Sequence, residues 1–327
     1  DLAARGAGDW PFILKVGADY SGHIKDLKAG AYLIPAGTSM AGIVGLLTGT
    51  GQSTCGTEIN YRIGVTATDV LVSELDPATQ KLTEVMKFDP VGAVPTDYAA
   101  FAKDPDVRLK VTLAEGVTSW QVVDALGRVD FLSGSIKDVQ AEGTVAPQQY
   151  ELVRGQDRAA LLSDMMADQS ATLTELWAKR ADGLPYKTPE EALIMASIVE
   201  KETGVPEERA KVASVFLNRM AQGMKLQTDP TVIYGLTQGK GILGRGLRQS
   251  ELRSNNPYNT YMIEGLPPGP IANPGRAAIE AALHPEKTGF LFFVADGTGG
   301  HVFAATLAEH NKNVAKWRKL EAQGSGG

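Results

Sequence analysis

The chain has only one cysteine, Cys55, among its 327 residues. A single thiol excludes an internal disulfide and any metal centre built from several cysteines, while it leaves the redox compartment open. Histidine is also scarce, and the few that occur fall in no ligand spacing such as HExxH. They are His23, His284, His301 and His310. We therefore expect no zinc site, no other metal and no cofactor.

Long apolar runs and an excess of basic charge are missing as well. No stretch reaches the roughly 18 apolar residues of a membrane span, so we expect neither a spanning helix nor a signal peptide within these residues. The formal net charge of -6 argues against nucleic acid as a partner, because phosphates call for a basic surface. A neutral or carbohydrate ligand fits this composition better.

Two common catalytic motifs are absent too. Ser197 and Lys201 stand four apart, where a serine acylase motif needs a spacing of three. The segment GLTQGKG lacks the Ser or Thr and the spacing of a phosphate-binding loop. What remains is a composition typical of a soluble globular protein, with 43% hydrophobic and 21% charged residues. The length favours two compact units.

Three stretches of the first half share one pattern, an apolar strand followed by a turn glycine and a short helix. Aligning Gly37, Gly116 and Gly155 also aligns an apolar pair in each following helix. Glycine suits a turn with positive φ, and Ser39 or Thr118 can cap the helix that follows. The pattern predicts small strand-turn-helix modules at residues 32–47, 113–126 and 150–166. Between the first two, residues 51–106 are interpreted as an insertion without an assigned role.

The second half carries helical signals. A helix is predicted from about residue 157, and ADGLPYK at 181–187 breaks it. Its candidate core residues are Leu161, Met165, Leu173 and Trp177. Thr188-Pro189-Glu190-Glu191 then predicts a helix start, with a threonine cap, proline at the first position and a capping box. This helix should end near Thr203, where Gly204 follows. It is apolar almost all round over residues 192–199, so we expect it to be buried centrally.

The remaining segments complete an α+β pattern. A helix should follow Pro206, with Val212, Val215, Phe216 and Met220 at helical spacing and Gly223 as its end. Residues 226–275, rich in proline, glycine and asparagine, are predicted to be loops. Strands at 290–295 and 301–304 flank DGTGG, a hairpin signal. Thr306 and Glu309 predict a capping box for a last helix.

Glu202 is the first candidate for chemistry. The residues three, four and seven positions before it are Val199, Ile198 and Met195, all apolar. An apolar wall disfavours a carboxylate and raises its pKa, which a general acid near neutral pH requires. The alternative is a helix-end glutamate that is solvated or pairs with Lys201 or Arg209. The spacing alone leaves both interpretations open.

Other polar residues have two interpretations each. Glu200 lies on another face of the same helix, as a buried partner for a loop or as an accessory acid. Asp229 is either a second carboxylate or the cap of a turn before Pro230. Aromatic and amide side chains in NNPYNTY at 255–261 and GLPPGPIANPG at 265–275 suit sugar binding, but also fit proline-stiffened loops.

Several segments resemble one known family. Residues 188–318 are similar to the endolytic murein transglycosylases, also called MltG or YceG-like proteins, in ASIVEKETGVPEERAKVASVFLNRM, GMKLQTDPTVIYGL, NPYNTYMIEGLPPGPIANPG and FFVADGTGGHVFAATLAEHNKNVAKWR. More loosely, LKAGAYLIPAGTSM and VTLAEGVTSWQVVDAL resemble the family's LysM-like region. Two departures stand out. Residues 51–106 are longer than the family segment, which bears on glycan docking, and APQQY at 146–150 replaces an acidic LPDTY-like sequence, which bears on a supporting contact.

The resemblance implies an α+β architecture in two parts. Residues 1–135 would form a LysM-like glycan-binding region of strand-turn-helix units, with the insertion at about 51–106. Residues 136–322 would form a mainly helical, lysozyme-like transglycosylase domain with a C-terminal β-hairpin. Residues 323–327, which include the closing Gly-Ser-Gly-Gly, would be a flexible tail.

The resemblance also implies a function. In the family the glutamate of a Glu-Thr pair is catalytic, which maps to Glu202 rather than Glu200. The substrate would be peptidoglycan glycan strands, cleaved between MurNAc and GlcNAc to give 1,6-anhydroMurNAc ends. Candidates for holding the substrate are Glu200, Asn218, Gln227, Thr228, Asp229, Tyr234, Tyr258, Asn259 and Tyr261. A hydrolytic muramidase and a non-catalytic peptidoglycan-binding scaffold remain the alternatives.

The implied setting is the cell envelope. Family resemblance implies a single-pass anchor in the cytoplasmic membrane, ahead of Asp1, with the catalytic part facing the periplasm or cell wall. Peptidoglycan synthases are the expected protein partners, and the expected role is to terminate or trim nascent glycan.

Overall fold

The computed structural model describes residues 19, 22, 25, 32, 34, 37–48, 56–76, 79 and 81–324. The chain divides into two compact units. The first comprises Asp1–Tyr61 with Asp69–Lys110, and the second comprises Arg62–Thr68 with Val111–Gly327. The mixture of helices and strands confirms the predicted α+β class. Cys55 lies outside the described residues, and the LysM-like character of residues 1–135 stays a prediction.

Over its described residues, the segment predicted as an insertion contains three strands and a short helix. It contains β1 (Thr57–Ile63), β2 (Thr68–Leu75), β3 (Leu82–Phe88) and α3 (Tyr98–Lys103), and α2 (Met40–Thr48) precedes it. β2 pairs antiparallel with β3, and their register shifts between Val72 and Ser73. The β-branched run at Asp69–Val72 accordingly forms part of β2, with Val70 and Val72 fully buried.

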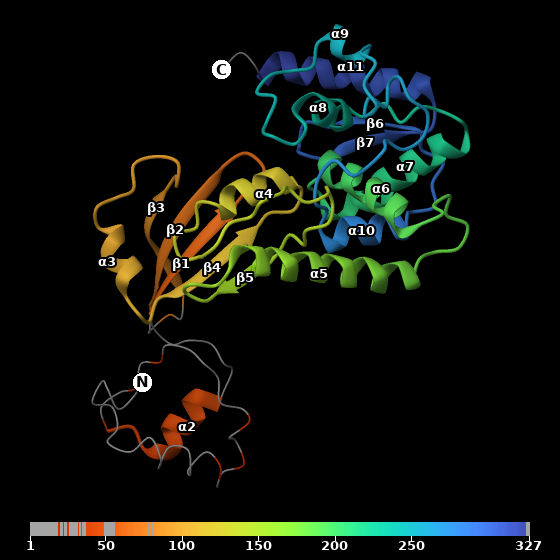
Figure 1. Cartoon of the computed structure of the whole chain (residues 1–327). Coiled ribbons are helices and arrows are strands. Elements are labelled where there is room, and N and C mark those ends of the chain that lie inside the picture. The colour runs from red at the N-terminus through yellow and green to blue at the C-terminus, as the bar shows by residue number, and fades with distance from the viewer. Residues whose placement is uncertain are drawn as a thin grey trace. The chain divides into compact units, whose positions relative to one another are not determined.

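The remaining elements are shown in Figure 1. In chain order they are β4 (Arg108–Leu113), α4 (Ser119–Leu126), β5 (Gln149–Leu152), α5 (Arg158–Ala178), α6 (Pro189–Glu202), the 3₁₀ turn η2 (Pro206–Glu208), α7 (Arg209–Ala221), α8 (Asp229–Thr237), α9 (Gln249–Leu252), α10 (Arg276–Leu283), β6 (Phe292–Ala295), β7 (His301–Ala304) and α11 (Leu307–Gly324). The strand order in the larger sheet is β3-β2-β1-β4-β5, and β6 pairs with β7 in a separate hairpin.

Two of the three predicted strand-turn-helix modules are confirmed. Gly116 between β4 and α4 has φ 79°, and Gly155 between β5 and α5 has φ 78°, so both need a residue without Cβ. Thr118 caps α4 in a reciprocal capping box with Gln121. In the remaining module Gly37 also has positive φ and α2 follows it, but the strand expected before Gly37 falls mostly outside the described residues.

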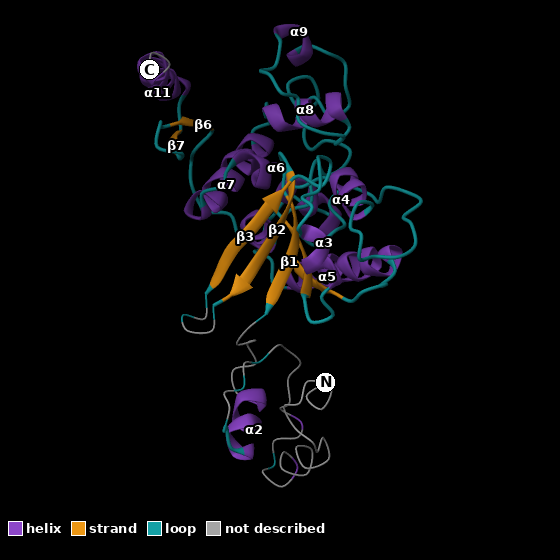
Figure 2. Cartoon of the chain, turned by 90° about the vertical axis from the view of Figure 1, so that its left-hand side faces the viewer, coloured by secondary structure: helices purple, strands orange, loops and turns teal. Residues whose placement is uncertain are grey.

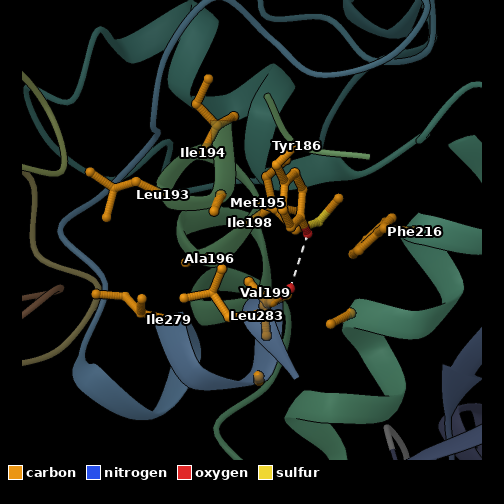
Figure 3. Close-up of a cluster of buried hydrophobic side chains, with 14 of the residues drawn as sticks. Tyr186, Leu193, Ile194, Met195, Ala196, Ile198, Val199, Phe216, Ile279 and Leu283 are labelled. Carbon is orange, nitrogen blue, oxygen red and sulfur yellow. Dashed lines mark hydrogen bonds between the residues drawn. The ribbon is translucent and has the colours of Figure 1, made fainter. Parts of the chain in front are cut away.

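The core of the second unit forms around α6, as its all-round apolar sequence predicts. Every residue from Ala192 to Val199 is buried, and the helix packs against α10, α7 and α5. Figure 3 shows Met195 and Ile198 among the side chains of these neighbours. The Tyr186 hydroxyl donates a hydrogen bond of 3.2 Å to the Ala282 carbonyl, which ties the segment before α6 to α10. Each large side chain buried here contributes about 1.5–3 kcal/mol, which fixes α6 along its length.

Only one half of the capping box predicted at the start of α6 forms. Thr188 accepts a hydrogen bond from the Glu191 amide at 3.4 Å, and Pro189 occupies the first helical position. The Glu191 carboxylate accepts from the amide of Lys187 instead of Thr188. The helix ends at Glu202, with Thr203 already extended.

The prediction of loops throughout residues 226–275 was wrong, because α8 and α9 lie within them. Asp229-Pro230 was interpreted as a turn signal, yet Asp229 is the first residue of α8. Proline is compatible with the first helical turn, where its missing N–H has no partner to lose. Thr231 and Val232 then point into the core, which anchors the helix.

The C-terminal hairpin and last helix are confirmed. β6 and β7 pair antiparallel from Phe292 opposite Ala304 to Ala295 opposite His301. Thr306 and Glu309 exchange hydrogen bonds of 3.2 Å each at the start of α11, which packs on the hairpin as Figure 2 shows. Among the helices that the structure describes, none combines the length and apolar character needed to cross a membrane.

Candidate active site

Glu202 lies at the C-terminal end of the buried helix α6, and its side chain is half-buried. The Thr228 hydroxyl donates a hydrogen bond to one of its carboxylate oxygens. The pairing with Lys201 or Arg209 that the sequence left open does not form. Lys201 donates to the Gly116 carbonyl at 3.2 Å, and Arg209 forms an ion pair of 3.6 Å with Glu115.

A cleft of about 510 Å³ opens beside this carboxylate. Its walls come from α6, α7, the start of α8, the loop at Tyr261, the hairpin and α11. The lining residues are Glu202, Arg219, Gln227, Thr228, Asp229, Tyr261, Phe292, Phe293, Leu307, His310 and Asn311. Polar and aromatic side chains thus line one cavity, a combination typical of carbohydrate sites.

Burial raises the pKa of the Glu202 carboxyl above its ordinary value. The Thr228 hydrogen bond opposes this rise because it stabilises the charged form, whereas the nearby Asp229 carboxylate adds to it. The electrostatic effects of His301 and Arg219 lower the pKa of Glu202, and both are smaller than that of Asp229. The net result is a carboxyl that keeps its proton to higher pH than a solvated glutamate. Such a group suits general acid catalysis near neutral pH.

Two buried threonines, Thr231 and Thr260, hold Thr228, the hydrogen-bond partner of this carboxyl, in place. The Thr228 amide donates to the Thr260 hydroxyl at 3.0 Å, and the Thr231 hydroxyl donates to the Thr228 carbonyl at 2.8 Å. The hydroxyls of Thr231 and Thr260 are also 2.9 Å apart. Because each polar atom has a partner, the Thr228 side chain is fixed relative to the end of α6.

The residues on either side of Thr228 present polar groups to the cleft. Gln227 has φ 49°, a left-handed backbone conformation that costs a non-glycine residue about 1 kcal/mol or more. Its side chain is exposed in the cleft. The Asp229 carboxylate accepts a hydrogen bond of 2.6 Å from the Tyr261 hydroxyl. The Asp229 carboxylate therefore lies in the cleft, where Tyr261 fixes its position, and does not cap a turn.

Comparison with known proteins assigns this chain to a family. The sequence pattern of the YceG-like family matches residues 1–316. The chain belongs to the YceG-like family. A Bacillus subtilis (strain 168) relative named endolytic murein transglycosylase is 48% identical over 125 residues, covering 38% of this chain and 34% of that protein. One of the same name from Streptococcus pneumoniae serotype 2 (strain D39 / NCTC 7466) is 35% identical over 182 residues, covering 54% and 32%.

These matches span about a third of the length of the curated relatives. A crystal structure of a YceG-like protein from Listeria monocytogenes extends the likeness to the fold. It superimposes with a TM-score of 0.52 at 25% identity, and the match covers 92% of this chain and 88% of that one.

In this YceG-like protein the structure brings together part of the predicted site. Gln227, Thr228, Asp229 and Tyr261 line the cleft with Glu202. Glu200 does not, because its carboxylate accepts from the Gly275 amide at 2.9 Å, and burial raises its pKa. This contact is the loop partnership that the sequence left as one of two interpretations.

The other predicted binding residues lie outside the Glu202 cleft. The Asn218 amide donates to the carbonyls of Thr288 and Phe290 at 2.9 Å each, which holds the chain before β6. Asn259 is 0% exposed, and its amide nitrogen donates to three carbonyls, those of Glu251, Leu252 and Ser254. In this structure the Asn218 and Asn259 amides hold loops, and a role of either in substrate binding stays a prediction.

Tyr234 and Tyr258 pack on each other, with ring centroids 4.8 Å apart, and both contact the core around α6. Tyr234 lines a second cleft, separate from that of Glu202. Tyr234 and Tyr258 therefore do not line the Glu202 cleft, whereas Tyr261 does.

Sequence reasoning missed Arg219 and the aromatic lining of the cleft. Arg219 donates to the carbonyls of Leu291 and Leu226 and lies 5.5 Å from the Phe292 ring centroid. Its position three residues after Phe216, on the apolar face of α7, was an available signal that this arginine is buried. Within the described part of the YceG-like chain, no three His, Cys, Asp or Glu residues are grouped to hold a metal ion.

Proposed function

We propose that this YceG-like protein is an endolytic lytic transglycosylase that cleaves the MurNAc–GlcNAc bond within peptidoglycan strands. The observation that carries the proposal is the half-buried Glu202 carboxyl, whose pKa is raised, at a cleft of about 510 Å³. The name of the two curated relatives, endolytic murein transglycosylase, supports the same substrate and reaction.

In the proposed reaction Glu202 serves twice. Its protonated carboxyl gives a proton to the glycosidic oxygen as the bond from MurNAc C1 to that oxygen breaks, and the GlcNAc end leaves as an alcohol. The resulting carboxylate takes the proton of the MurNAc 6-hydroxyl, whose oxygen bonds to C1 and closes the 1,6-anhydro ring. Protons balance without water, a cofactor or a second carboxylate, and the tethered hydroxyl needs little further positioning.

The other cleft residues would bind the sugars. Gln227 and the Asp229–Tyr261 pair offer hydrogen-bonding groups beside Glu202, and Phe292 and Phe293 offer aromatic faces for C–H bonds. Arg219 and Thr228 would stabilise the carboxylate that forms after proton donation, since both favour its charged state.

A hydrolytic muramidase is the second candidate, and one observation favours it. Asp229 places a second carboxylate in the same cleft, where it can activate water as in two-carboxylate glycosidases. The two reactions leave different ends, because hydrolysis gives reducing MurNAc and the transglycosylase gives 1,6-anhydroMurNAc.

Digestion of purified sacculi, followed by mass spectrometry of the released fragments, tests the proposal. Anhydro ends from the wild type, lost in Glu202→Gln and retained in Glu200→Gln, are the expected result. Reducing ends would establish the muramidase instead. Binding of intact glycan without any released fragment would favour a non-catalytic scaffold, and loss of anhydro ends in Glu200→Gln alone would overturn the assignment of Glu202.

The cellular setting is part of the proposal. The family resemblance supports a LysM-like glycan-binding role for residues 1–135, a single-pass anchor in the cytoplasmic membrane and a catalytic part facing the periplasm or cell wall. There the enzyme would terminate or trim nascent glycan beside peptidoglycan synthases. Co-purification of tagged full-length protein with the synthases, and its digestion by protease added to spheroplasts, test these points.

A further inference from the structure

A second cleft, of about 300 Å³, adjoins the same two helices as the candidate active site. Consecutive residues divide between the two cavities. At the end of α6, Lys201 lines the second cleft and Glu202 lines the first. At the start of α8, Pro230 lines the second and Asp229 lines the first. Because neighbouring Cα atoms are about 3.8 Å apart, the second cleft begins within one residue of the proposed catalytic carboxyl.

The lining of this cleft combines two cationic side chains, Lys201 and Arg245, with apolar walls. Lys201 is half-buried and donates one hydrogen bond, to Gly116, so two of its three N–H groups remain available. The apolar part consists of Ile233, Tyr234, Ile242, Leu243 and Ile271. Ile242 is 60% exposed, and an apolar side chain in a solvent-facing cleft gains free energy when a ligand covers it.

Among the described residues that line the cleft, Lys201 and Arg245 carry the positive charges, and they differ in their partners. Arg245 is bound by the Glu251 carboxylate at 2.5 Å. The Glu142 carboxylate accepts a hydrogen bond of 2.7 Å from the Ser119 amide. Burial raises the pKa of Glu142, which weakens its electrostatic attraction to Lys201. Burial lowers the pKa of Lys201 by more than the Glu200 and Glu142 carboxylates raise it, so an additional carboxylate beside it would stabilise the ammonium. The chemistry fits a small ligand with a carboxylate and short apolar side chains.

We propose that the second cleft binds the peptide stem of the glycan strand whose sugars occupy the Glu202 cleft, with a stem carboxylate on Lys201 and alanine methyl groups against Ile233 and Ile242. The inference rests on the proposed function. A stem peptide is acidic, carries small apolar side chains and is attached to the MurNAc ring next to the bond that is cut. It must therefore leave the first cleft close to Glu202, where Lys201 begins the second.

The first test compares cleavage of peptide-bearing strands with that of strands stripped by an amidase. The wild type should cut peptide-bearing strands with a kcat/KM about 10-fold higher, the effect expected of one charge-assisted hydrogen bond. Lys201→Gln should bring this ratio near 1, and Lys201→Arg should keep most of it. Ile242→Asp, at an exposed position that tolerates substitution, should lower the ratio by repelling the stem. Lys240→Gln, which removes an exposed charge nearby, should leave the ratio as in the wild type.

The second test measures binding of the free tetrapeptide L-Ala-γ-D-Glu-L-Lys-D-Ala by calorimetry, without turnover. Binding by the wild type that weakens about 10-fold in Lys201→Gln supports the site even if no strand is cut, in which case only the proposed reaction fails. If strands are cut equally well with and without stems and the tetrapeptide does not bind, the peptide site is overturned while the proposed reaction stands.

Discussion

The hydroxyl of Thr228 donates a hydrogen bond to the carboxylate of Glu202, across the junction between the end of α6 and the start of α8. Burial favours the protonated form of this carboxyl, and the Thr228 bond favours the charged form. A residue that must give a proton and then take one back needs both forms within reach. The contact therefore moderates the pKa of the proposed acid.

Replacing Thr228 by valine should raise the pKa of Glu202 further. The proposed acid works when protonated, so activity falls as pH rises through this pKa. In Thr228→Val the alkaline limb of kcat/KM against pH should move to higher pH, as measured by release of soluble glycan fragments. Thr174→Val removes a hydroxyl from the exposed face of α5, away from the cleft, and should leave the limb in place. A limb that moves to lower pH in Thr228→Val would contradict the role of this bond.

The raised pKa also predicts how stability depends on pH. Ionising Glu202 costs more in the folded protein than in the unfolded chain, so its contribution to the free energy of unfolding falls as pH rises from its ordinary value through the raised one. Glu202→Gln should therefore unfold at higher temperature than the wild type at pH 7. The difference should shrink below about pH 4, where the carboxyl is protonated in both states. Thermal unfolding at several pH values measures this, and a variant less stable at pH 7 would speak against the burial penalty.

Gln227 should show a conflict between stability and activity. Its φ of 49° suits glycine, so Gln227→Gly should gain up to about 1 kcal/mol, yet it removes a side chain from the cleft and should lower kcat/KM. Gln238, with φ 55° at the C-terminal cap of α8, offers a matched control. Gln238→Gly should gain similar stability with unchanged activity. Equal activity loss in both variants would show that Gln227 acts only through the fold.

Asn259 should matter for stability. Asn259→Ala removes one donor from each of three carbonyls, of which Glu251 and Ser254 keep others and Leu252 is left without one among the described residues, and it should cost about 1–3 kcal/mol in the free energy of unfolding, measured by urea denaturation. Asn255→Ala, at an exposed position in the same segment, should change it by less than about 0.5 kcal/mol. If Asn259→Ala is as stable as the wild type but loses affinity for glycan, the original interpretation of Asn259 as a binding residue is supported.

The sequence predicted correctly those elements whose start, burial or turn depends on neighbouring residues. The start of α6 at Thr188-Pro189, its burial from Ala192 to Val199 and the turn glycine at Gly116 each depend on residues within one or two helical turns. The same kind of signal failed at α8, because Asp229-Pro230 is compatible with both a turn and a helix start. The choice was made by burial of Thr231 and Val232, which the local sequence does not specify.

The candidate site was predicted in one half only. Glu202, Gln227, Thr228, Asp229 and Tyr261 were all candidates from the sequence and line one cleft, while their roles stay predictions. Phe292, Phe293 and residues of α11 also line the cleft. The sequence predicted the hairpin and the last helix, but did not indicate that they contribute to the site. Asn218 and Asn259 were assigned to the substrate because an amide looks the same in sequence whether it faces a ligand or a buried carbonyl.

The sequence by itself determined α5, α6, α7, α11 and the hairpin, the placement of a carboxyl after an all-apolar helix, and the resemblance to one family, because these depend on residue type and spacing. Only the tertiary structure decided that Thr228 reaches Glu202, that Lys201 and Glu202 line different clefts, and that aromatic side chains of the hairpin line the cleft of Glu202. Those relationships depend on how α6, α7, α8 and the hairpin pack, and packing is settled by contacts between residues far apart in the chain.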